Sequence, residues 1–203
     1  MSLKHKMILL GDSQVGKTSL ILKYIKNEFN FNTTTTMSPK SFYEKEIIIK
    51  NNKIDLVIWD TVGQDKFKQI TKINIKGAKM VLLIFDLTNI ESFKNLDNWY
   101  NLVKDILDVN KVIIGVVGNK NDLIECIDIN EQDINNFVKK INAFYYSTTA
   151  TEGDTVNNCF DNIIEKYFEK FVKINDRIEL NNSIKITKSD HIKKNNKKLI
   201  CCK

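Results

Sequence analysis

The chain has 203 residues, of which 28% are charged and 42% hydrophobic, and its formal net charge is +6. A chain of this length suits one globular domain. No apolar run reaches the roughly 18 residues needed to span a bilayer, and no signal peptide opens the chain, so we expect a cytosolic protein. The whole net charge falls on residues 172–203, which carry nine Lys or Arg and three Asp or Glu. Because the remainder is neutral, we expect no nucleic-acid partner.

The sequence predicts three consecutive elements near its start: a buried strand at residues 7–10, a glycine loop at 11–18 and a helix at 19–26. The loop, GDSQVGKT, fits G-x-x-x-x-G-K-[ST], in which backbone N–H groups and the helix N-terminus face one anion. Lys17 adds positive charge, and the Thr18 hydroxyl can ligate Mg²⁺. A glycine turn that matches by chance would not explain the flanking strand and helix. The candidate phosphate-binding residues are Ser13, Gln14, Val15, Gly16, Lys17, Thr18 and Ser19.

The rest of the chain alternates between strand and helix patterns. Two β-patterned runs flank Asn51-Asn52 and predict a hairpin, and three later apolar runs predict buried parallel strands. The predicted strands are 41–50, 53–60, 80–86, 111–118 and 143–147, and the predicted helices are 91–107, 130–141 and 154–172. This order predicts an α/β fold of the P-loop NTPase type. Its doubly wound, mostly parallel sheet has one antiparallel edge strand and helices on both faces.

Two further motifs come at the carboxyl ends of predicted strands, where such sheets bind ligands. Residues 59–64 read WDTVGQ and residues 119–122 read NKND. With the glycine loop, over residues 4–171, they make the chain similar to Ras-superfamily GTPases, and most of all to the Rab family. The resemblance implies a GDP/GTP switch with Mg²⁺ that hydrolyses GTP and regulates vesicle-mediated transport.

The NKND motif implies a guanine site. The Asp122 carboxylate would accept hydrogen bonds from guanine N1–H and the guanine amino group, a donor pair that adenine lacks. Asn119 and Lys120 would buttress the base. An ordinary polar turn is the alternative for the tetrapeptide alone.

Two more segments complete the implied base site. Thr149, Ala150 and Thr151 stand where the family has Ser-Ala-Lys, so that Ala150 can offer its N–H to the guanine oxygen while the family lysine is missing. Phe29 falls where the family stacks an aromatic ring on guanine, with Phe31 as the alternative.

At the terminal phosphate, the resemblance assigns a role to four residues. Asp60 would hold Mg²⁺ through water, the Gly63 N–H would sense the phosphate, and Gln64 would orient the attacking water. Counting from the glycine loop makes Thr36 the second Mg²⁺ ligand, with Thr35 as the alternative.

Several residues depart from the family pattern in this region. Gln14, Pro39 and Val62 replace residues that are small or flexible in the family. The only arginine is Arg177 in the tail, so the charge that assists hydrolysis would come from a separate activator. A GTP-binding scaffold with little or no hydrolysis therefore stays open as an alternative, whereas the guanine motif disfavours a small-molecule phosphotransferase.

The residues that would contact effectors also differ in part from the family pattern. Phe42 and Trp59 match two members of the family's aromatic triad, but Asn74 replaces the third. The resemblance implies effectors, an exchange factor, a GTPase activator and a prenyl-binding escort as partners of a monomer.

The tail completes the resemblance. We place the GTPase domain at residues 1–174 and a basic tail at 175–203, too polar to fold alone. Cys201 and Cys202 resemble the C-C-x terminus that carries two geranylgeranyl groups, which would hold the protein on the cytoplasmic face of an intracellular membrane while it cycles with cytosol. Cys126 and Cys159 are isolated in the sequence and fit neither a disulfide framework nor the spacing of zinc ligands, so we expect them to be packing thiols.

Overall fold

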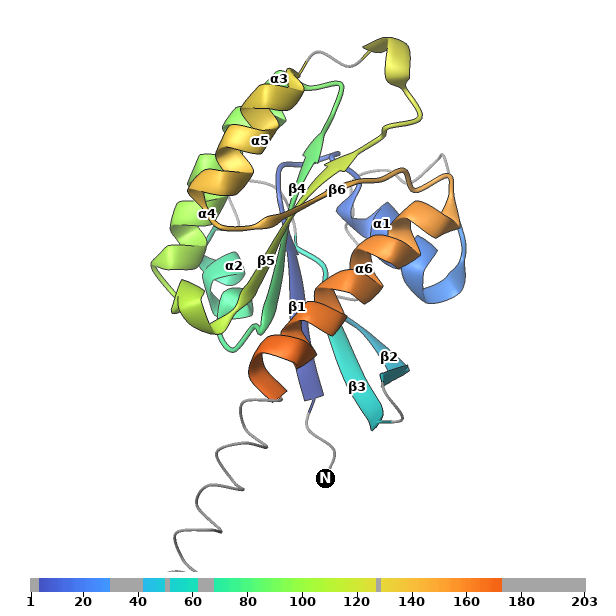
Figure 1. The fold of residues 1–203 in the computed structure, drawn as a ribbon, viewed down its shortest axis with the longest axis vertical. Coiled ribbons are helices and arrows are strands. Elements are labelled where there is room, and N and C mark those ends of the chain that lie inside the picture. Colours follow the sequence, from blue (N-terminus) through green and yellow to red (C-terminus); the bar gives the residue numbers. More distant parts are fainter. Residues whose placement is uncertain (1–3, 30–41, 50–51, 62–67, 127–128, 173–203) are drawn as a thin grey trace, which may run out of the picture. The chain divides into compact units, whose positions relative to one another are not determined.

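A computed structural model describes residues 4–29, 42–49, 52–61, 68–126 and 129–172 of the chain (Figure 1). The chain divides into two compact units, residues 1–166 and residues 167–203. The first unit holds the sheet and every residue of the candidate site that the structure describes.

Six strands form one sheet in the order β2-β3-β1-β4-β5-β6. Only β2 and β3 pair antiparallel, and the other neighbours run parallel. The strands are β1 (Lys4–Leu10), β2 (Phe42–Ile49), β3 (Asn52–Trp59), β4 (Met80–Asp86), β5 (Ile113–Asn119) and β6 (Phe144–Ser147). The predicted hairpin and the mostly parallel sheet are confirmed, although β5 begins two residues later than the apolar pattern indicated.

The central strands are buried on both sides, which explains their continuous apolar runs. All seven residues of β4 and all seven of β5 are buried, whereas β2 at the sheet edge alternates between exposed and covered side chains. Helices α1 and α6 cover one face, and α2 to α5 cover the other (Figure 1). On that second face Ile75, Trp99 and Phe137 pack with residues of the central strands in one core.

The helices are α1 (Lys17–Lys26), α2 (Lys68–Ile75), α3 (Ile90–Lys94), α4 (Leu96–Lys104), α5 (Glu131–Lys140) and α6 (Gly153–Tyr167). The single helix predicted over residues 91–107 is wrong, because it divides at Asn95 and ends at Lys104. Helix α2 was not predicted. Ile75 is buried in the core, but Ile70 and Ile73 are exposed, so the isoleucines of α2 do not form one buried face.

The last helical segment that the structure describes differs from the prediction. Helix α6 ends at Tyr167, and a π-helical turn, η4 (Phe168–Val172), follows it where the sequence predicted a continuous helix. The predicted domain boundary after residue 174 lies outside the described residues. Within the described ranges, no helix has both the length and the apolarity required to cross a membrane.

Candidate functional site

The glycine loop connects β1 to α1, so the predicted order of strand, loop and helix is confirmed. Gly16 has φ of 95°, and a Cβ there would lie 2.3 Å from the Asn119 side-chain nitrogen. Gly11 also needs to lack a side chain, because a Cβ there would lie 2.1 Å from the carbonyl oxygen of Ile84. No side chain caps the start of α1, and a helix N-terminus of this kind favours an anion.

Lys17, the first residue of α1, has its ammonium inside the loop. The side chain is 6% exposed, and Nζ donates to the carbonyl oxygens of Gly11 at 2.8 Å and Asp12 at 2.6 Å. Burial lowers the pKa of Lys17 to about 8, while the carboxylates of Asp60 and Asp12 act in the opposite direction. A phosphate group arriving in the loop would raise the pKa of Lys17 again, because a nearby negative charge favours the charged ammonium.

Asp60 follows β3 and faces Thr18 across the loop. Thr18 Oγ1 donates to Asp60 Oδ2 at 2.6 Å, whereas the buried Asp60 Oδ1 has no hydrogen-bond partner among the described residues. Burial raises the pKa of the Asp60 carboxyl above its usual value, against the effects of the Thr18 hydroxyl and Lys17. A buried carboxylate oxygen without a partner, next to a threonine hydroxyl, suits the oxygen-ligand preference of Mg²⁺. These two predicted ligands therefore fit the metal.

Asn119, the last residue of β5, joins the predicted base site to the glycine loop. Its side chain is 2% exposed, and Nδ2 donates to the Val15 carbonyl oxygen at 2.8 Å. On its other side, Asn119 Oδ1 accepts from Thr148 Oγ1 at 3.3 Å. The motif predicted Asn119, but it did not reveal Thr148, whose side chain is completely buried.

Lys120 and Asp122 extend from the same strand end. Lys120 has φ of 64°, and its ammonium lies 2.5 Å from Asp86 Oδ2. Asp86 is 7% exposed at the carboxyl end of β4. Its position at a strand end is the signal that could have identified it from the sequence. The Asp122 side chain is exposed, so a guanine base could reach its carboxylate.

The segment after β6 lies next to this strand end. The Asn121 N–H donates to the Thr148 carbonyl oxygen at 3.1 Å, which brings residues 119–122 and 148–151 together. Thr149 and Ala150 are buried, and the hydroxyls of Thr149 and Thr151 lie 2.7 Å apart. Thr151, which replaces the family lysine, thus stabilises the turn through a hydrogen bond.

Comparisons with known proteins agree with this geometry. A sequence model described as the Ras family matches residues 6–169. The chain is 32% identical to the GTP-binding protein ypt3 of Schizosaccharomyces pombe over 163 residues, which are 80% of this chain and 75% of that protein. It is also 32% identical to Ras-related protein Rab11B of Nicotiana tabacum over 164 residues, with 81% and 75% coverage. The chain belongs to the Rab family of small GTPases. Membership supports a GTP-binding switch.

Some residues that the Rab resemblance singled out lie outside the described ranges. These are Thr36, Gly63, Gln64, Cys201 and Cys202, the alternatives Thr35 and Phe31, and the departures from the family pattern Pro39 and Val62. Phe29 is described and half-buried, three residues after the end of α1. The prediction for Cys126 as a packing thiol is wrong, because this cysteine is exposed in the turn after the NKND motif, whereas Cys159 is buried.

The two Rab-type aromatic residues on the sheet edge lie beside each other. Phe42 pairs with Trp59 across β2 and β3, and their ring centroids are 5.5 Å apart. Phe42 is 41% exposed, and Trp59 lies under the Lys6 ammonium at 4.2 Å. The exposure of Phe42 fits the predicted partner surface, whereas Trp59 is partly buried against the core.

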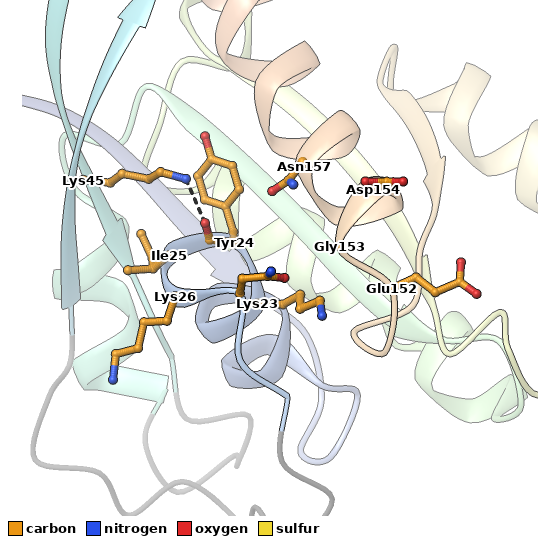
Figure 2. Close-up of a pocket in the computed structure, with 10 residues that line it drawn as sticks. Lys23, Tyr24, Ile25, Lys26, Lys45, Glu152, Gly153, Asp154 and Asn157 are labelled. Carbon is orange, nitrogen blue, oxygen red and sulfur yellow. Dashed lines mark hydrogen bonds between the residues drawn. The ribbon is translucent and has the colours of Figure 1, made fainter.

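A pocket of about 690 Å³ lies between the last turn of α1, β2 and the start of α6 (Figure 2). Side chains of both charges line it, among them Lys23, Lys45, Glu152 and Asp154. The Lys45 ammonium donates to the Tyr24 carbonyl oxygen at 2.8 Å and lies 3.6 Å from the centre of the Tyr24 ring. None of the predicted nucleotide-binding residues lines this pocket, so we do not assign it to the nucleotide in this Rab-family protein.

Proposed function

We propose that this chain binds GTP and GDP at the loop between β1 and α1 and hydrolyses GTP as a molecular switch. The observation that carries the proposal is the hydrogen bond from Asn119 Nδ2 to the Val15 carbonyl oxygen, at 2.8 Å. It connects the segment that would read guanine to the loop that would hold phosphates, although the two residues are 104 positions apart. One ligand with a base and a phosphate chain would satisfy both ends.

The residues around the loop would bind the phosphates in different ways. Lys17 would place a positive charge beside them, and the uncapped start of α1 would supply N–H donors. Thr18 and Asp60 would hold Mg²⁺, which supplies neutralising positive charge to the phosphates when bound. Gln64 would orient the attacking water. Because phosphoryl transfer asks little covalent chemistry of the protein, this positioning would account for the catalysis.

The base preference provides the decisive experiment. Asp122→Ala removes the acceptor for N1–H and the amino group of guanine, so we expect GTP affinity to fall about 30- to 1000-fold. Asn121→Ala is the matched control, because this neighbour in the same turn bonds to the Ser147 hydroxyl. Competition titrations with GTP, ATP and xanthosine triphosphate measure the preference. Unchanged GTP selectivity in the Asp122 variant would contradict the proposed base site.

We further propose that the switch acts in vesicle-mediated transport. The Rab name of a relative supports this role, as does the contact between Phe42 and Trp59, in which Phe42 is exposed. Effectors would recognise the GTP-bound form, and an exchange factor, an activator and a prenyl-binding escort would control the cycle. Attachment to the cytoplasmic face of an intracellular membrane would use geranylgeranyl groups on Cys201 and Cys202.

One observation favours the alternative of a scaffold that hydrolyses GTP slowly or not at all. Gln14 has φ of 67° and an exposed side chain in the glycine loop, where a small residue would leave more space beside the phosphates. Single-turnover phosphate release by the wild-type chain, compared with a Gln14→Gly variant, separates the two functions. Hydrolysis that appears only in the glycine variant supports the scaffold.

A further inference from the structure

Asp12 is the second residue of the glycine loop, and both oxygens of its carboxylate accept hydrogen bonds. The donors are Trp99 in helix α4 and Asn95, the residue just before that helix. Asn95 Nδ2 donates to Asp12 Oδ2 at 2.7 Å, and Trp99 Nε1 donates to Asp12 Oδ1 at 2.8 Å. The loop pattern allows any residue at this position, and neither donor belongs to any nucleotide-binding motif of the sequence. The loop is therefore attached to a helix more than 80 residues away.

The break between α3 and α4 occurs at Asn95, one of these two donors. Asn95 keeps helical backbone angles, with φ of −70° and ψ of −10°, and its carbonyl oxygen accepts from the Trp99 N–H at 3.2 Å. Asn95 and Trp99 are thus one helical turn apart and present both donors to the same carboxylate. Trp99 is 6% exposed, so packing restrains the direction of its indole N–H.

Both side chains that donate to Asp12 are neutral, so they orient its carboxylate without neutralising the charge. An arginine or lysine partner would cancel the carboxylate charge, whereas two amide or indole N–H groups orient it and leave it in place. The Asp12 carbonyl oxygen accepts directly from Lys17 Nζ at 2.6 Å.

We propose that Asn95 and Trp99 are positioning residues for nucleotide retention, acting through the Asp12 carboxylate on the start of the glycine loop. This inference rests on the proposed nucleotide site. The two donors keep the start of the loop in the arrangement in which the carbonyl oxygens of Gly11 and Asp12 accept from Lys17 Nζ. Loss of either donor lets Asp12 move, and the nucleotide then leaves faster.

The test measures release of fluorescently labelled GDP from the full chain after addition of excess unlabelled GDP. Asn95→Ala and Trp99→Phe each remove one donor, and we expect release about three- to tenfold faster. The matched controls on the same helix are Asn101→Ala and Tyr100→Phe, which remove an exposed amide and a hydroxyl outside the loop contact. We expect both controls to release GDP at the wild-type rate.

A second readout separates positioning from a general loss of stability. Trp99→His keeps a ring N–H donor on a smaller side chain, and its GDP release and urea unfolding are compared with those of Trp99→Phe. We expect Trp99→His to release GDP more slowly than Trp99→Phe, although its smaller ring packs less well. Asp12→Ala removes the acceptor of both donors, and we expect release at least as fast as in either donor variant.

The outcomes are distinct. Faster release from the donor variants together with rescue by Trp99→His supports the inference. If neither Trp99 variant folds, an Asn95→Ala/Asp12→Ala double variant that releases GDP no faster than Asp12→Ala supports it. Release that follows the loss of stability and not the loss of the donor overturns it, because a merely structural role would give that result. Unchanged release also overturns it. Failure of the wild-type chain to bind GDP refutes the proposed function itself, before the variants are compared.

Discussion

Replacing Asn119 with alanine tests the junction between the glycine loop and the base-reading segment. The wild-type amide donates to the buried Val15 carbonyl oxygen at 2.8 Å and accepts from the Thr148 hydroxyl at 3.3 Å. Alanine removes both hydrogen bonds while the two partner groups stay buried. The substitution also leaves a gap beside Gly16, where the amide nitrogen now fits closely.

The magnitude follows from the two groups left without a partner. A buried polar group that loses its hydrogen bond costs about 1–3 kcal/mol, and the long Thr148 contact should count less than the Val15 contact. We therefore expect the free energy of unfolding to fall by about 2–4 kcal/mol. For a domain of this size, the melting temperature should fall by about 5–15 °C.

The assay is urea unfolding of the wild-type and variant chains, each with saturating GDP and without added GDP. Asn121→Ala is the control, because its amide bonds to Ser147 at the surface and should change stability by at most about 0.5 kcal/mol. The Asn119 variant should also gain less stability from GDP than the wild type, since its binding segments are no longer joined. Equal losses in both variants would refute the reasoning.

Three further predictions concern charge, catalysis and attachment. Because the pKa of Lys17 is about 8 and phosphate binding needs its charged form, GDP affinity should fall above that pH by up to about tenfold per pH unit, and a flat titration profile would contradict this. Gln64→Leu should slow single-turnover GTP hydrolysis while nucleotide affinity stays within about twofold, and equally slow release from both proteins would favour the scaffold. Replacing Cys201 and Cys202 with serine should leave the nucleotide-binding protein in the supernatant after membrane fractionation. Neutralising the four lysines at 193–198 should only weaken attachment, because their field is screened by salt.

The sequence predicted most elements because their patterns are local. The continuous apolar runs of β4 and β5 matched strands that are buried on both sides. Asn130 lies just before α5, and its side chain caps this helix by accepting from the Gln132 N–H. Helix α2 was not predicted because two of its isoleucines, Ile70 and Ile73, are exposed, so its apolar residues do not show the helical spacing of a buried face. The helix break at Asn95 also escaped, because its backbone angles stay helical and the residue pattern continues through it.

The sequence alone determined which residues carry the candidate chemistry, because the glycine loop and the NKND motif are each contained in eight residues or fewer. Only the tertiary structure decided how they meet. The sheet order brings the carboxyl ends of β1, β3, β4 and β5 to one edge. There, Asp60 is buried beside Thr18, Asn119 reaches Val15, and Lys120 pairs with Asp86. These contacts join residues more than 30 positions apart, and no local periodicity encodes them. They arise because burying the apolar faces of the sheet brings the strand ends together and removes water from the polar groups between them.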